Sequence, residues 1–100
     1  MASDFNIISY DFGDSLYLSL YGDFDGSSAH ELINILKEHG NSFWDIYIDT
    51  NELKMIHPFG RDAFQKNLNG IEKQLKNLMI IGANKHKIAP KAFTLEVPRL

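Results

Sequence analysis

Two short segments alternate apolar and polar residues, and this alternation constrains the fold more than any other feature of the chain. Within 16–21 the leucines occupy every second position, and within 44–49 two isoleucines do the same. A period of two indicates a strand that is buried on one face only. Parallel sheets that are covered on both faces contain continuous apolar runs instead. The sequence therefore predicts a sheet with helices on one face and water on the other.

A helix between these two segments carries clear signals at both ends. Ser28 and Glu31 have the spacing of a capping box, in which each side chain satisfies a backbone N–H at the helix start. Gly40 follows as the expected C-terminal cap. The apolar residues between them repeat at helical steps, at Ala29, Leu32, Ile33 and Leu36. We predict a helix over 28–39 with one buried face.

The same two periods predict the remaining elements. A first strand over 5–11 and a turn at 12–15 precede the strand that ends at Tyr21. Residues 50–57 form a tight loop followed by a second short apolar segment. The second helix begins at Pro58, a residue favoured at the first helical position, with His57 as its N-cap. Gly70 predicts a kink or an early helix end near 69–70. The buried stripe of this helix is expected to contain Phe59, Ala63, Phe64, Leu68, Ile71 and Leu75.

The last part of the chain is predicted to add a strand, a helical turn and an edge strand. Residues 78–81 are continuously apolar and end at Gly82, as a short buried strand would. Residues 84–90 are compatible with a helical turn, and Phe93, Leu95 and Val97 alternate like a last edge strand. With both long helices on one face, right-handed crossovers add the later strands successively to the same side of the sheet.

Composition places the chain among soluble single domains. Its 100 residues are 44% apolar and 23% charged, which predicts one domain over residues 1–100. A net charge of −3 argues against a nucleic-acid partner, because such surfaces cluster Lys and Arg. The absence of cysteine and of paired histidine spacings argues against a metal site. No apolar run is long enough for a membrane span, and we expect a cytoplasmic protein.

Three segments, taken in order and spacing, resemble the STAS domain, the fold of anti-sigma factor antagonists and of sulfate-transporter tails. They are 20–25 with the following helix start, the strand and loop over 46–60, and the strand 78–82. The resemblance covers about residues 10–83. It implies an α/β single-domain fold, with a mixed sheet of four or five strands and helices packed on one face.

The resemblance also identifies a loop that carries regulation in the family. There the loop reads aspartate, serine, serine or threonine, glycine, and its first hydroxyl is phosphorylated by a kinase that is also an anti-sigma factor. The corresponding residues here are His57, Pro58, Phe59 and Gly60. Only the glycine matches, and Pro58 has no hydroxyl to phosphorylate. The resemblance implies a bacterial signalling protein that binds a protein partner, such as an anti-sigma factor or kinase, without enzymatic activity, a cofactor or this switch.

The predicted partner-binding residues surround this loop: His57, Pro58, Phe59, Gly60, Asp25 and Ser27. Phe59 is either a docking residue or part of the core. For His57, a role in capping the helix or filling the loop is favoured over a role in sensing pH or binding an anion. Thr50, Ser27 and Ser28 are other hydroxyls near the loop, for which structural roles are favoured over phosphorylation. An alternative function is a small-ligand or nucleotide sensor that uses the amides of the second helix start.

A second interface is predicted on the face of the sheet that no helix covers. Tyr17, Tyr21 and Tyr47 fall on this face, and exposed tyrosines are favoured at interfaces. The alternative is that a tail segment folds over them. Whether the protein forms a homodimer stays open.

Overall fold

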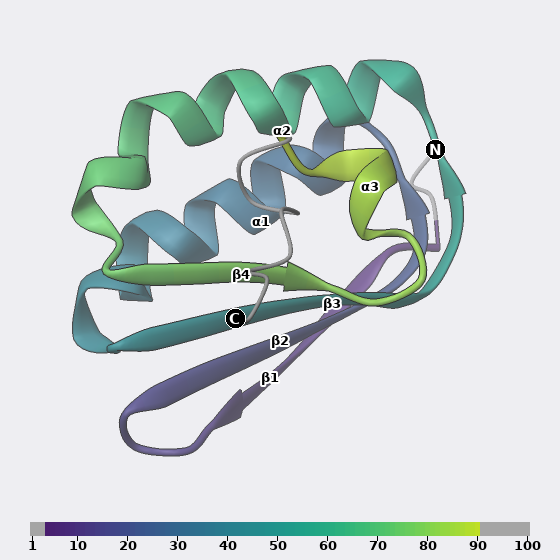
Figure 1. The fold of residues 1–100 in the computed structure, drawn as a ribbon. Coiled ribbons are helices and arrows are strands. Elements are labelled where there is room, and N and C mark those ends of the chain that lie inside the picture. The colour runs from purple at the N-terminus through teal and green to yellow at the C-terminus, as the bar shows by residue number, and fades with distance from the viewer. Residues whose placement is uncertain (1–3, 91–100) are drawn as a thin grey trace, which may run out of the picture.

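The computed structural model describes residues 4–90, and these form one sheet with helices on one side (Figure 1). The strands are β1 (Asn6–Asp11), β2 (Ser15–Phe24), β3 (Asp45–Ile56) and β4 (Asn77–Ile81). The helices are α1 (Gly26–His39), α2 (Pro58–Ile71) and the short α3 (Lys85–Ile88). Single turns of 3-10 helix, Gly40–Ser42 and Glu72–Gln74, follow α1 and α2.

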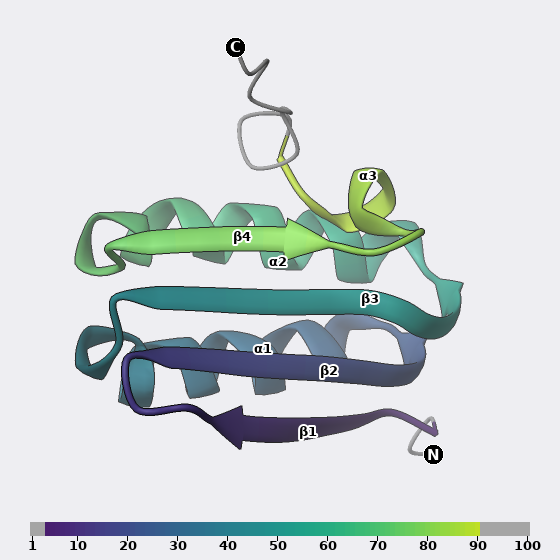
Figure 2. The ribbon, with the colours of Figure 1, turned by 60° about the horizontal axis from the view of Figure 1, so that its bottom comes forward.

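The strand order confirms the predicted topology. The four strands lie in the order β1-β2-β3-β4, with β1 antiparallel to β2 and the other pairs parallel. Helices α1 and α2 both pack on one face, and Figure 2 looks onto the opposite face, where no described helix crosses the strands. The sheet is thus mixed, and each later strand joins the same side. The predicted edge strand through Phe93, Leu95 and Val97 lies outside the described residues.

The core forms between the sheet and the two long helices. The inward residues of β2 and β3 and the apolar faces of α1 and α2 are buried together. Within the core, the fully buried aromatic rings of Phe24 and Phe64 meet edge to face, with centroids 6.0 Å apart. This arrangement confirms the predicted alternation, because Leu16, Leu18, Leu20, Ile46 and Ile48 all point into the core.

Both central strands are longer than predicted. β2 continues through Gly22 to Phe24, and β3 runs through the predicted loop to Ile56. Irregular register between Ser19 and Tyr21, and again after Gly22, lets the two strands stay paired to their ends. Gly22 lies at the second irregularity and has a φ of +92°, a backbone conformation that other residues rarely adopt. The apolar–polar alternation breaks at these irregularities. A prediction from the alternation alone therefore placed the ends of both strands too early.

Two details of the helices also differ from the prediction. Helix α1 begins at Gly26 with Asp25 as its N-cap, and Ser28 lies inside the first turn. Phe59 is 74% exposed and does not belong to the buried stripe of α2, which starts at Gly60 and Phe64. The early helix end is close to the prediction, since α2 finishes at Ile71, one residue after Gly70.

Candidate functional site

The predicted loop lies where β2 and β3 end and both long helices begin. The backbone N–H of His57 donates to the carbonyl of Phe24 at 3.0 Å, so the two strand ends are joined at this point. Helix α1 starts two residues after Phe24, and α2 starts one residue after His57. The carboxyl ends of parallel strands are where open α/β sheets commonly place their binding sites.

Gly60 holds the first turn of α2 against the connection between β2 and α1. A Cβ atom at Gly60 would lie 2.7 Å from the carbonyl oxygen of Phe24 and 2.7 Å from the carbonyl carbon of Asp25. Both neighbours are backbone atoms that cannot move without shifting a strand or a helix. The one residue of the loop that matches the STAS pattern is therefore required by the close approach of two backbones.

Asp25 is a carboxylate fixed at the start of α1. Its Oδ1 accepts hydrogen bonds from the Ser28 backbone N–H at 3.0 Å and the Ser27 hydroxyl at 2.9 Å, and it lies 3.0 Å from the Ser28 hydroxyl, whose one proton is shared with the closer Asp23 carbonyl. An acceptor at this position satisfies backbone donors that the helix leaves unpaired and suits the helix dipole. The cap therefore places Asp25 and Ser27 next to the Gly60 turn.

Phe59 lies on the surface directly over the start of α1. A Cβ atom at Gly26 would come within 2.8 Å of Phe59 Cε2, so the ring occupies the space that a side chain at Gly26 would need. One edge of the ring packs on the glycine, while 74% of the side chain is open to solvent. The structure thus places Phe59 outside the core. Gly26 was not recognised from the sequence, because nothing local shows that a distant ring covers it.

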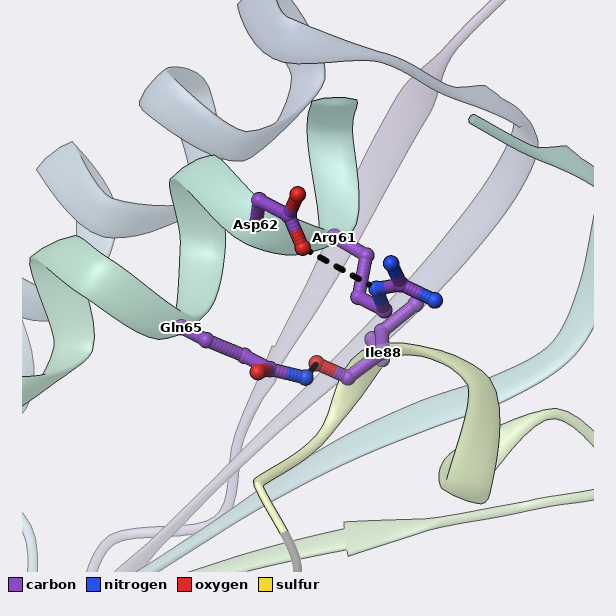
Figure 3. Close-up of polar contacts among 4 residues, drawn as sticks. All are labelled: Arg61, Asp62, Gln65 and Ile88. Carbon is purple, nitrogen blue, oxygen red and sulfur yellow. Dashed lines mark hydrogen bonds and ion pairs between the residues drawn. The ribbon is translucent and has the colours of Figure 1, made fainter. Parts of the chain in front are cut away.

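His57 and Arg61 frame the first turn of α2. His57 caps the helix through its backbone only: its carbonyl accepts from the Arg61 N–H at 3.0 Å, without a side-chain capping bond. The exposed imidazole of His57 is therefore not used by the cap. Further along α2, the Arg61 guanidinium pairs with Asp62 at 3.2 Å. The Gln65 side chain donates to the Ile88 carbonyl at the end of α3 at 3.1 Å (Figure 3).

The three other candidate hydroxyls differ in position and access, and Thr50 lies in the middle of β3. Thr50 and Ser28 are buried, with relative exposures of 0% and 1%. Thr50 donates to the Ile81 carbonyl, and Ser28 donates to the Asp23 carbonyl. Ser27 is exposed and bonded to Asp25. The structure brings all six predicted loop residues together and gives Thr50 and Ser28 structural hydrogen bonds.

The three predicted tyrosines lie on the helix-free face of the sheet. The rings of Tyr17 and Tyr47 are 6.2 Å apart, and Tyr21 follows two residues beyond Ser19 on β2. The Tyr17 hydroxyl donates to Asp49 Oδ2 at 2.5 Å. This hydrogen bond, with partial burial and the negative charge of Asp49, raises the pKa of Tyr17 from 10.0 to about 12. The Tyr17–Asp49 pair could not be predicted from the sequence, because it depends on the register between β2 and β3.

Two other kinds of site are absent from residues 4–90. No three His, Asp or Glu side chains in this range are placed to hold a metal ion, and no helix in it has the length and apolarity to cross a membrane. A hollow of about 200 Å³ lies beside the end of α1, lined in part by Asp11, Ile35 and His39. It is at the opposite end of the sheet from the loop over 57–60, so the two are separate features.

Solved structures share this fold at low sequence identity. An anti-sigma factor antagonist from Mycobacterium paratuberculosis matches with a TM-score of 0.61 and 16% identity over 79% of this chain and 68% of that one. The anti-sigma factor antagonist SpoIIAA in its unphosphorylated form matches with a TM-score of 0.56 and 9% identity over 87% of this chain and 80% of that one. The chain thus has the SpoIIAA-like STAS fold, as the sequence resemblance predicted.

The same fold also occurs within a larger protein. Mglu in its L-glutamate binding form matches with a TM-score of 0.70 and 10% identity over 84% of this chain. The chain spans only 20% to 28% of the Mglu chains that it matches. No protein-family model and no curated protein sequence matches this chain.

Proposed function

We infer that the protein is a non-enzymatic interaction module that resembles an anti-sigma factor antagonist and binds a protein partner through the Phe59 loop. We define this loop as residues 57–60, together with Asp25 and Ser27. The observation that carries the proposal is the position of Phe59, a large apolar side chain held 74% exposed by the backbone contacts beneath it. Aromatic residues are often hot spots of protein interfaces, where they contribute a large share of the binding free energy.

The chemistry of the loop favours binding that does not depend on phosphate. Pro58 stands where the family accepts phosphate, and it has neither a hydroxyl nor a backbone N–H. Thr50 and Ser28 are buried and hydrogen-bonded, which makes them poor substitutes. We therefore propose that the partner, an anti-sigma factor, a kinase of that type or another signalling protein, binds constitutively or under a different control.

A small-ligand or nucleotide sensor is the weaker alternative. Such a sensor would use backbone N–H groups at the start of α2, and Pro58 removes one of them. The exposed ring of Phe59 next to that helix start adds apolar surface where an anion needs donors. Ligand binding would raise the melting temperature in the presence of nucleotides or phosphate.

The binding test compares two exposed aromatic residues at opposite ends of β3. Phe59→Ala should weaken binding to an anti-sigma factor kinase by about tenfold or more, as loss of an interface aromatic does. Trp44→Ala is the matched control, because Trp44 is 60% exposed and precedes the start of β3. Equal affinities for Phe59→Ala and the unmodified protein would place the interface elsewhere.

The phosphorylation test uses the same kinase with ATP and intact-protein mass spectrometry. No phosphate should appear on residues 57–60 of the unmodified chain. Pro58→Ser restores a hydroxyl at the first helical position and provides the comparison. Phosphate on 57–60 of the unmodified chain would contradict the proposal, because the loop would then still carry a switch.

A further inference from the structure

The helix-free face of the sheet carries a row of aromatic side chains across three strands. The register aligns Tyr10 of β1, Tyr17 of β2 and Tyr47 of β3, with Met79 of β4 next to Tyr47. The ring centroids are 6.0 Å apart for Tyr10 and Tyr17 and 6.2 Å apart for Tyr17 and Tyr47. We call this row and the rows of Ser19 and Tyr21 beside it the tyrosine face.

The charged groups of the tyrosine face are acidic. Asp49 lies in the row of Ser19, and Glu52 lies in the row of Tyr21. The Asp49 carboxylate is fixed at both oxygens, since Oδ2 accepts from Tyr17 at 2.5 Å and Oδ1 accepts from the Asn51 N–H at 2.9 Å. None of the described strand residues that pair in these three rows is Lys or Arg. The face thus combines π surfaces with fixed negative charge and has no cation of its own in these rows.

We propose that the tyrosine face binds an arginine-bearing segment of a partner protein. A guanidinium can stack on a tyrosine ring and at the same time donate two parallel hydrogen bonds to a carboxylate. Tyr17, Tyr47 and Asp49 offer both partners within one patch. Ile81 lies next to Asp49 in its row, and Ile8 ends the same row beyond Ser19, so apolar residues between the arginines of the segment would also find contacts.

Charge favours this occupant over the other candidates for an aromatic sheet face. Single-stranded nucleic acid stacks on such rings but needs cations for its phosphates, and Asp49 and Glu52 would repel them. A second copy of the chain would bring two acidic faces together without a Lys or Arg in these rows to compensate. The tyrosine face is also distinct from the Phe59 loop, so this inference does not depend on the proposed function.

The test uses the full-length protein and a short peptide that alternates arginine and leucine. Backbone amide shifts in NMR titrations should concentrate on the tyrosine face. Tyr47→Ala and Glu52→Gln should each weaken binding, Tyr47→Ala by about tenfold. Glu52→Gln removes an exposed charge and leaves the core intact, so its effect separates binding from folding. Phe59→Ala should bind with unchanged affinity, and a lysine–leucine peptide should bind more weakly than the arginine peptide.

Five results would overturn the proposal. The first is shifts spread over acidic residues away from the face, such as Asp62, and the second is equal affinity for the lysine peptide. The third is tight binding of single-stranded oligouridylate, and the fourth is a dimer in sedimentation that Tyr47→Ala dissociates. The fifth is a rise in peptide affinity when Phe93 and Leu95 are both changed to serine, which would show that the chain's own C-terminal residues occupy the face.

Discussion

The hydroxyl of Thr50 accepts a hydrogen bond from the backbone N–H of Asn84 at 3.1 Å and donates one to the Ile81 carbonyl at 2.8 Å. Thr50 is fully buried, and the Asn84 side chain donates in return to the Thr50 carbonyl at 2.9 Å. This exchange ties the middle of β3 to the turn after β4. Thr50 therefore has a structural role in holding β3 to the turn after β4.

Replacing Thr50 by valine should destabilise the fold by ~1–3 kcal/mol. The substitution keeps the shape but leaves the Ile81 carbonyl and the Asn84 N–H without their partner. Thr50→Ser retains the hydroxyl and should lose less. Urea unfolding of both variants measures the difference, and a valine variant as stable as the serine variant would show that these hydrogen bonds contribute nothing.

Replacing Gly60 by alanine should lower the stability of the fold, whereas replacing Gly70 by alanine should raise it. At Gly60 the new methyl group would meet the backbone of Phe24 and Asp25, and strain of this kind typically costs ~1–3 kcal/mol. At Gly70 nothing lies within 4 Å, and alanine within a helix is more stable than glycine by ~0.5–1 kcal/mol. Unfolding free energies of the two variants, measured side by side, check the prediction. A neutral Gly60→Ala would contradict the close approach of α2 to the β2–α1 connection.

The order and type of the elements could be predicted because they depend on local patterns. The alternation at Leu16–Leu20 and at Ile46–Ile48 records which face of each strand is buried, and Pro58 marks the start of α2. Each of these signals is complete within a few residues. The strand order followed from them, because short right-handed connections leave few other arrangements.

The features that could not be predicted depend on contacts between distant segments. Phe59 fits the helical spacing of the buried stripe, but Gly60 brings the helix start so close to Asp25 that the ring turns onto Gly26 instead. The Tyr17–Asp49 hydrogen bond depends on the register of two strands, although the sequence did place Tyr17 and Tyr47 on one face. The sequence thus predicted which residues lie close together at the loop, but not how they contact one another.

Asp25, rather than the predicted capping box, should determine the stability of the α1 start. Asp25→Ala removes the acceptor of the Ser28 backbone N–H and of the Ser27 hydroxyl and should cost ~0.5–2 kcal/mol, the usual range for an N-cap. Glu31 was the other member of the predicted box, and it is exposed. Glu31→Ala should change stability by less than about 0.5 kcal/mol. If thermal or urea unfolding showed equal losses of stability for the two variants, the result would instead support the predicted capping box.

The pair of Tyr17 and Asp49 should make stability depend on pH in the alkaline range. The hydrogen bond to Asp49, with burial and charge repulsion as smaller causes, raises the pKa of Tyr17 from 10.0 to about 12 in the folded protein. The folded state thus holds this proton more tightly than the unfolded chain does. The stabilisation is complete below about pH 10 and is lost as the pH rises toward about 12.

Urea unfolding at a series of alkaline pH values tests this pair. The difference in unfolding free energy between the unmodified protein and Tyr17→Phe should stay constant up to about pH 10 and shrink above it. Asp49→Asn removes the carboxylate that causes the largest part of the shift, so the pKa of Tyr17 should fall toward 10.0 and the pH dependence should flatten. Tyrosinate absorbance of the folded proteins gives an independent reading. A Tyr17→Phe variant that loses an ionisation step at 10.0 instead of one near 12 would show that Asp49 does not hold the Tyr17 proton.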